Sequence, residues 1–247
     1  MTWREEAARL PNLSPAEFVL NSETTGLLVI DMQYVDAHRD HGLGKSLKET
    51  HPEVWDYYFT RIERTVVPGC KRLVDAFRAA GSRVIFITLG PELPDGGDMV
   101  ALRRPKVTPG LEAMLFGRGT FEHEILEELA PLPGELVINK TSRGAFNSTA
   151  IERQLLNLGL DGLIVAGVST SSCVETTARD AADRGWKVTI VEDATAEFDE
   201  PSHDATLRQF AVRWGRVWTV EETLAELNMS GAGGESSAES STDSAGR

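Results

Sequence analysis

Three side chains capable of nucleophilic chemistry lie at or just beyond the ends of short apolar segments. Asp31 and Lys140 end two such segments directly, and Cys173 follows a third one across a short turn. A thiolate can attack a carbonyl carbon, a carboxylate can take its proton and return it to a leaving nitrogen, and an ammonium can orient the acid. A thiol, an acid and an amine at one sheet edge would form a nucleophilic site.

The surroundings of Cys173 give the most informative signal. The stretch GVSTSSCVE, residues 167–175, places a turn of small residues between a buried strand and a helix that begins near Ser172. Free N–H groups at a helix N-terminus stabilise a thiolate and lower its pKa, and N–H groups in the turn can stabilise an oxyanion. The alternative is an inert cysteine that packs the helix against the sheet.

Asp31 and Lys140 each have an ordinary alternative as well. An acid at the end of an apolar strand is costly unless it is paired or functional, but it can also cap the next segment. A lysine at a strand end can simply be exposed. The functional interpretation is that Asp31 is a general base and that Lys140 supplies a positive charge that orients it.

The elements that must bring these residues together alternate along the chain. Apolar, β-branched segments of strand length lie at residues 27–31, 83–88, 135–140, 162–167, 187–193 and 216–220. Helical patterns that stop at a glycine lie between most of them, at residues 61–80, 148–158, 172–184 and 201–214. This alternation predicts an α/β fold with a mostly parallel sheet covered on both faces.

Two segments depart from the alternation. Residues 32–60 are polar and aromatic, and residues 89–134 are rich in proline and glycine. Both follow the carboxyl end of a predicted strand, the edge at which open α/β sheets bind ligands. We therefore expect both segments to form walls of a pocket.

Three motifs resemble the isochorismatase-like cysteine hydrolases, especially the branch of N-carbamoylsarcosine amidase, biuret hydrolase and ureidoacrylate amidohydrolase. They occur in the family's order as LVIDMQ, KTSRGAFNST and GVSTSSCVETTARDA, beginning at residues 28, 140 and 167. The similarity extends from about residue 25 to residue 227. It is specific for the superfamily and does not specify the substrate.

The resemblance implies a three-layer α/β/α fold with a six-stranded, doubly wound parallel sheet. It implies that Asp31, Lys140 and Cys173 form a catalytic triad that works through a thioester on Cys173. It also implies a cis peptide between Val168 and Ser169, and an oxyanion hole made of the N–H groups of Ser169 and Cys173. It further implies that the chain forms a homodimer or homotetramer.

The resemblance also narrows the reaction. Nicotinamidases of the superfamily bind a metal through an Asp-x-His motif after the second strand, and residues 88–94 contain no such motif. We therefore predict neither a metal nor another cofactor, and we treat His38, Asp40 and His41 as loop residues. Isochorismatases proper, which cleave a vinyl ether, often lack the cysteine. Cys173 thus favours a small linear amide, ureido or carbamoyl compound as substrate.

Five further residues are candidates for binding the substrate: Gln33, Tyr34, Phe146, Asn147 and Arg213. Arg213 could bind a substrate carboxylate, although a solvated arginine at a helix end is more common. The aromatic pair could line the pocket together with Trp55, Tyr57 and Tyr58, or belong to the core or a subunit interface. Asn147 could bind an amide group or cap the following helix.

Composition limits the other partners. The chain has 247 residues, of which 41% are hydrophobic and 26% charged, and its formal net charge of −13 argues against nucleic acid and anionic membranes. No secretory signal or membrane-spanning run is evident, so we expect a cytoplasmic protein. We divide it into an N-terminal arm (1–25) with a short helix at residues 14–17, a hydrolase domain (26–229) and a disordered tail (230–247).

Two hypotheses from other functional classes use the same residues. Cys173 could be a redox or electrophile sensor, but no second cysteine lies near it in the sequence, and we interpret Cys70 as a packing residue. The fold could also be a non-catalytic binder of small molecules, which the presence of all three candidate residues disfavours.

Overall fold

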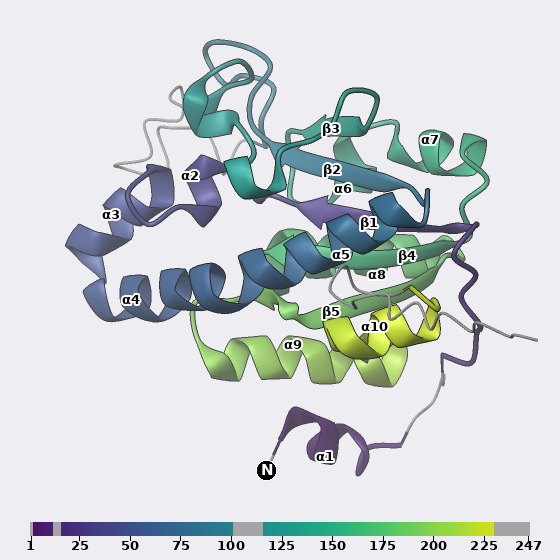
Figure 1. The fold of residues 1–247 in the computed structure, drawn as a ribbon. Coiled ribbons are helices and arrows are strands. Elements are labelled where there is room, and N and C mark those ends of the chain that lie inside the picture. Colours follow the sequence, from purple (N-terminus) through teal and green to yellow (C-terminus); the bar gives the residue numbers. More distant parts are fainter. Residues whose placement is uncertain (1, 12–15, 101–115, 230–247) are drawn as a thin grey trace, which may run out of the picture.

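The computed structural model describes residues 2–11, 16–100 and 116–229. Its centre is a six-stranded sheet in which every neighbouring pair is parallel (Figure 1). The strand order is β3-β2-β1-β4-β5-β6. The strands are β1 (Thr25–Ile30), β2 (Val84–Leu89), β3 (Leu136–Lys140), β4 (Gly162–Val168), β5 (Lys187–Ala196) and β6 (Arg216–Trp218). The predicted α/β class and the six-stranded sheet are thereby confirmed.

The order of the strands reverses at the seam between β1 and β4. The chain first builds outward through β2 and β3, and then returns to add β4, β5 and β6 on the other side. Such a reversal opens a crevice at the carboxyl edge of a parallel sheet. The residues that follow β1 and β4 therefore face each other there.

Helices cover both faces of the sheet, and alternate residues of β1 reach different cores. Leu27 and Val29 join the apolar cluster of one face, whereas Leu28 and Ile30 join that of the other. The first face carries α4 (Pro52–Arg61), α5 (Val67–Ala79) and α10 (Val220–Glu226). The second carries α7 (Ile151–Asn157), α8 (Glu175–Asp183) and α9 (Glu200–Arg213). Burial on both faces explains why the strands are continuously apolar.

The structure corrects several expected element boundaries. Residues 32–60 are mostly helical, in α2 (Tyr34–Ala37), α3 (Gly42–Thr50) and α4. Helix α4 continues through the short π-helix η1 (Ile62–Val66) into α5. The helix expected at residues 148–158 is divided into α6 (Ala145–Ser148) and α7 because Thr149 is extended. Gly81, Gly159 and Gly185 have the positive φ of a helix-ending glycine. Gly215 does not, and it instead lies close to the Val188 carbonyl.

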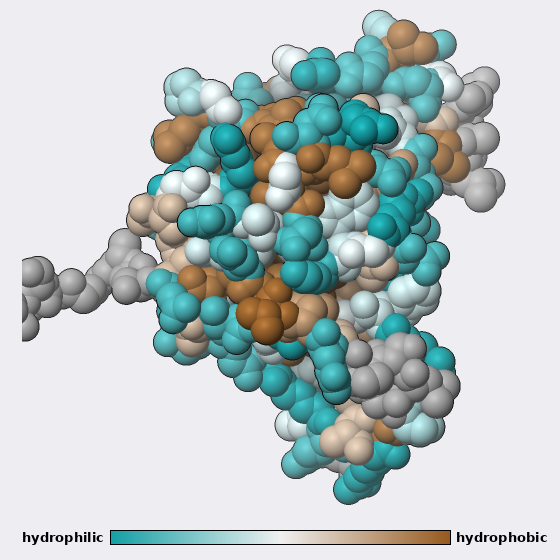
Figure 2. Space-filling view, turned by 90° about the vertical axis from the view of Figure 1, so that its right-hand side faces the viewer, coloured by the Kyte–Doolittle hydropathy of each residue, from teal (hydrophilic) through white to brown (hydrophobic). Residues whose placement is uncertain are grey.

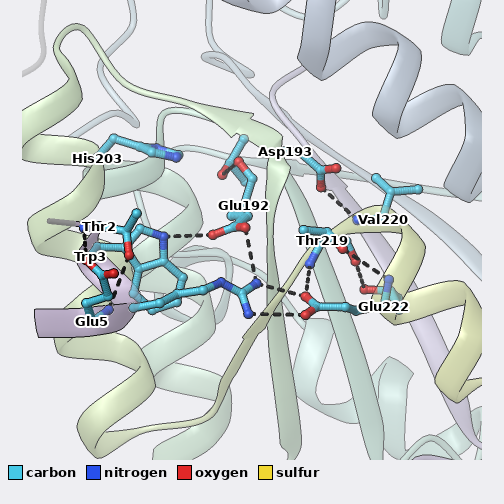
Figure 3. Close-up of polar contacts among 12 residues, drawn as sticks. Thr2, Trp3, Glu5, Glu192, Asp193, His203, Thr219, Val220 and Glu222 are labelled. Carbon is cyan, nitrogen blue, oxygen red and sulfur yellow. Dashed lines mark hydrogen bonds and ion pairs between the residues drawn. The ribbon is translucent and has the colours of Figure 1, made fainter. Parts of the chain in front are cut away.

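The N-terminal arm begins with a helix at a place that the sequence did not predict. Helix α1 (Trp3–Ala7) packs on α9, and Trp3 donates a 2.7 Å hydrogen bond to Glu192 (Figure 3). Arg4 joins Glu192 to Glu222 through contacts of 3.1 and 2.8 Å. The arm thus lies on its own domain. Part of the helix expected at residues 14–17 lies outside the described residues, and residues 16 and 17 are not helical.

The surface is mixed in character. On the face shown in Figure 2, apolar residues gather in patches between hydrophilic ones. Within the described ranges, no helix has both the length and the apolar character needed to cross a membrane.

The seam between β1 and β4 gives a prediction for stability. Gly167 has φ +113°, and a Cβ atom there would lie 2.0 Å from the Ile30 carbonyl oxygen. Gly167→Ala should lower the free energy of unfolding, measured in urea, by about 3 kcal/mol or more. Gly159→Ala is the matched control, because φ is +71° there and nothing lies within 4 Å of the added Cβ. It should cost only about 1 kcal/mol, and equal losses would contradict the prediction.

Candidate active site

Asp31, Lys140 and Cys173 lie together at the carboxyl edge of the sheet. Lys140 ends β3, two strands from β1, and its long side chain passes the end of β2 to reach Asp31. The Lys140 Nζ atom lies 2.8 Å from Asp31 Oδ2 and 3.4 Å from Cys173 Sγ. Lys140, Asp31 and Cys173 are 0%, 1% and 7% exposed. The ammonium group therefore joins the acid to the thiol inside the protein.

Asp31 occupies an unusual backbone conformation directly after β1. Its φ is +52°, in the left-handed region that a non-glycine residue rarely adopts. Such strain persists where the surrounding structure enforces it, often at functional sites. One carboxylate oxygen accepts the Lys140 hydrogen bond, and the buried Oδ1 accepts none from the described residues. Oδ1 is thus free to take a proton.

Cys173 lies in the turn between β4 and α8. The Val168–Ser169 peptide is cis, and residues Thr170–Val174 form a short π-helix, η7. The Ser169 carbonyl accepts the N–H groups of Ser172 and Val174 at 3.1 and 3.2 Å. The Ser169 N–H makes no hydrogen bond within the described part of the chain, so it is available to a ligand.

Burial and charge control the protonation of the site. Burial and the nearby Asp31 carboxylate raise the pKa of Cys173 to about 12, despite the opposing effect of Lys140. This reverses the expectation of a thiol pKa lowered by the helix N-terminus, because desolvation outweighs the favourable charges. Burial alone would lower the pKa of Lys140, but Asp31 and Cys173 raise it overall, which keeps the amine charged.

A cavity of about 440 Å³ opens onto Asp31 and Cys173. Its apolar walls come largely from the two segments expected to form them, and they include Val35, Leu43, Leu89, Met99 and Phe116. Asp36, Tyr58 and Arg143 also line the cavity, and the side chains of these three residues form no hydrogen bond or ion pair with the described residues. These three side chains are therefore available to a ligand.

Asp36 and Arg143 were missed by sequence reasoning. Asp36 follows Asp31 by five residues, and the short helix α2 returns it to the cavity. Burial, then the Asp31 charge, raises the pKa of Asp36 to about 7. Arg143 lies within the second motif and is the one cation among the described lining residues. The sequence feature that could have identified it is its position three residues after Lys140, just beyond the carboxyl end of a predicted strand.

Glu197 was also missed, because β5 is longer than expected. It follows directly on Ala196, the last residue of β5, and lines the cavity. Its two carboxylate oxygens accept the N–H groups of Ser171 at 2.7 Å and Phe198 at 3.0 Å. Glu197 therefore ties the turn that carries Cys173 to the end of β5.

The five expected substrate-binding residues lie elsewhere, and none of them lines the cavity. The Gln33 amide is occupied by backbone groups of Leu89 and His123. Asn147 donates to Asp180, and Phe146 packs against Trp186.

Tyr34 and Arg213 are also displaced from the site. Tyr34 packs against the rings of His38, His41 and Phe121. Arg213 ends α9, which runs back toward the amino edge of the sheet. His41 contacts Glu122 at 3.1 Å, and the described ranges contain no group of three or more His, Cys, Asp or Glu residues placed to hold a metal.

Comparisons with known proteins agree with this geometry. The family model described as the isochorismatase domain matches residues 25–222. Ureidoacrylate amidohydrolase RutB of Rhizobium rhizogenes is 27% identical over 236 residues, which cover 91% of this chain and 92% of the relative. YwoC of Bacillus subtilis, an uncharacterised isochorismatase family protein, is 31% identical over 165 residues, 66% of this chain and 83% of the relative.

Solved structures show the same architecture. A cysteine hydrolase from Pseudomonas syringae pv. phaseolicola superposes with a TM-score of 0.73 at 25% identity, covering 87% of this chain and 97% of that one. N-carbamoylsarcosine amidase from Thermoplasma acidophilum has a TM-score of 0.57 at 21% identity, with coverage of 80% and 97%. At that identity the second likeness concerns the fold alone.

The raised thiol pKa predicts how Cys173 reacts with iodoacetamide. Because only the thiolate reacts, its alkylation rate should rise about tenfold per pH unit from pH 7 to pH 9, without a plateau. Peptide mass spectrometry separates Cys173 from Cys70, which is buried away from the cavity. Asp36→Asn removes a negative charge that raises the Cys173 pKa, so it should accelerate the reaction. A plateau below pH 8 would show that the pKa is lowered instead.

Proposed function

The chain belongs to the isochorismatase family of hydrolases, and from this premise we propose that it is a cysteine amidohydrolase. It cleaves a C–N bond of a small linear amide, ureido or carbamoyl compound through a thioester on Cys173. The observation that carries the proposal is the buried contact of Lys140 with both Asp31 and Cys173 at the base of a cavity. A structural ion pair alone would not require a thiol beside it.

The first half of the reaction forms the thioester. Asp31 Oδ1 takes the proton of Cys173, and Lys140 stabilises the thiolate across 3.4 Å. The sulfur attacks the carbonyl carbon, and the N–H groups of Ser169 and Cys173 stabilise the oxyanion. The intermediate collapses as the C–N bond breaks, and Asp31 gives its proton to the leaving ammonia or amine.

The second half releases the acid. Asp31, again a carboxylate, takes a proton from water while the water oxygen attacks the thioester carbon. The C–S bond breaks, and Asp31 returns the proton to Cys173. The raised thiol pKa suits this cycle, because a weakly acidic thiol needs a positioned base and is restored to the neutral form after each turnover.

The substrate class is supported by a relative and by the cavity. RutB is named for a ureido compound that also bears a carboxylate. The exposed Arg143 has no ion-pair partner among the described residues, and at the cavity it can bind such a carboxylate as a bidentate partner. We therefore propose ureido and carbamoyl acids as the first compounds to test.

Ammonia release from a panel of amides, ureides and carbamoyl acids tests the proposed reaction. Cys173→Ala and Asp31→Asn should each lower kcat at least about 1,000-fold, because each removes a member of one catalytic unit. Cys70→Ala, the matched cysteine control, should retain activity. Hydroxylamine should divert the thioester to a hydroxamate. Full activity in Cys173→Ala, or no turnover of any compound, would contradict the proposal.

Arg143→Gln tests the anchor for the carboxylate. The variant should raise KM for carboxylate-bearing substrates about tenfold to a hundredfold, the usual strength of a charge-assisted hydrogen bond. Uncharged amides should be affected little. Arg213→Gln is the control, because Arg213 lies away from the cavity. Equal effects of Arg143→Gln on charged and uncharged substrates would assign Arg143 another role.

A further inference from the structure

A buried chain of hydrogen bonds lies behind the turn that carries Cys173. The Arg61 Nη2 atom lies 2.9 Å from Nε2 of His203, and Nδ1 of His203 lies 2.9 Å from the Thr170 hydroxyl. Thr170 is fully buried and His203 is 4% exposed. The chain joins three elements that are distant in sequence: the end of α4, helix α9 and the turn η7. The reaction proposed above uses none of these three residues.

The partners of His203 determine where its proton lies. A guanidinium has only N–H donors, so the nitrogen that faces Arg61 must accept and cannot carry a hydrogen. A neutral imidazole then has its hydrogen on Nδ1. His203 therefore donates to the Thr170 hydroxyl oxygen, and Arg61 fixes this direction.

Arg61 is itself held in place by the end of β5. Its Nε atom donates to the Thr195 carbonyl, and Nη2 also donates to the Glu192 carbonyl, both at 3.0 Å. These carbonyls belong to the strand that leads directly to Glu197. The end of β5 is therefore connected to the turn η7 in two ways. One connection runs through Arg61 and His203, and the other runs through Glu197.

Two neighbouring residues of the turn are fixed by this support. His203 holds the side chain of Thr170, and Glu197 holds the N–H of Ser171 at 2.7 Å. Thr170 is the first residue of η7 and directly follows the cis peptide, and Cys173 lies three residues further on. A displacement at Thr170 would thus move both the Ser169 N–H and the sulfur.

We propose that His203 is a positioning residue: held as the Nδ1–H tautomer by Arg61, it anchors Thr170 and so sets the geometry of Cys173 and of the oxyanion hole. This role rests on the proposed function, because it concerns attack by the Cys173 sulfur. Reacting groups must be held close to the productive geometry, and a misplacement of about 1 Å can cost a hundredfold in rate.

The environment of His203 keeps the anchor constant. Burial, then the Arg61 charge, lowers the pKa of His203 to about 3, against the smaller opposing effect of the Glu192 carbonyl. The imidazole therefore stays neutral, and the direction of its hydrogen bonds does not change, throughout the pH range in which a cysteine hydrolase would work.

Substitution of Thr170 tests the anchor while the buried imidazole itself stays in place. Thr170→Val removes the hydroxyl at similar volume, and Thr170→Ser retains it. The matched control is Thr189→Val, because Thr189 is a fully buried threonine of β5 whose hydroxyl has no partner among the described residues. Thr170→Val should lower kcat by about tenfold to a hundredfold with KM within about threefold of wild type, and Thr170→Ser should restore most of it.

Two readouts do not depend on turnover. Site-resolved alkylation of Cys173 by iodoacetamide at pH 8 should change at least about threefold in Thr170→Val and stay at the wild-type rate in Thr189→Val. Nitrogen-15 NMR of the folded protein should show His203 as the Nδ1–H tautomer from pH 5 to pH 8. Circular dichroism melting confirms that each variant is folded.

The outcomes separate this inference from the proposed function. If Thr170→Val and Thr189→Val have the same kcat and the same alkylation rate, His203 does not position the site, whatever the reaction is. An Nε2–H tautomer, or a His203 that titrates near pH 6.5, would also overturn the inference. If no compound is hydrolysed, the proposed function fails while the alkylation and NMR results still decide the role of His203.

Discussion

The site depends on a buried ion pair, between Lys140 and Asp31, that is shielded from water beside the Cys173 thiol. Taking a carboxylate and an ammonium out of water costs several kcal/mol per ion unless they are well paired. Lys140 and Asp31 offset this cost through a 2.8 Å contact, and Lys140 uses a further direction toward Cys173. Lys140 must therefore be long enough to pass β2, and Asp31 must turn its carboxylate inward. These two requirements account for the position of Lys140 at the end of β3 and for the backbone conformation of Asp31.

Three unusual backbone conformations lie at that same edge. Asp31 has φ +52°, Gly167 has φ +113°, and the segment η7 after β4 is a short π-helix. These features lie at or just beyond the ends of β1 and β4, two strands whose side chains are apolar on both faces. They bring groups from separate strands within a few ångströms of one another. The strain is tolerated because the surrounding sheet and helices hold the edge from all sides.

Periodicity predicted the parallel sheet, and strand-end chemistry pointed to Asp31, Lys140 and Cys173, although the roles of Asp31 and Lys140 rested mainly on the family resemblance. They failed where the answer depends on how side chains turn. Gln33 follows Asp31 closely, but its amide binds the backbone of Leu89 and His123. Asp36 reaches the cavity only because α2 forms after the strand, and a short helix of four residues has almost no periodic signal.

The pKa of Cys173 shows a second limit of the sequence. The position near a helix N-terminus was correct, but the effect of that position depends on how much water reaches the sulfur. With 7% exposure and a carboxylate beside it, the thiol is less acidic than usual. Burial at this depth is a property of the packed domain. No local motif encodes it.

The reversal of strand order at β1 and β4 divides the candidate site between two halves of the polypeptide. The acid and the amine belong to the part of the chain that forms β1, β2 and β3, and the thiol belongs to the part that begins with β4. During synthesis, the acid and the amine leave the ribosome before the thiol does. The three groups can meet only when β4 pairs with β1, so the acid and the amine remain without the thiol until the fourth strand has joined the sheet.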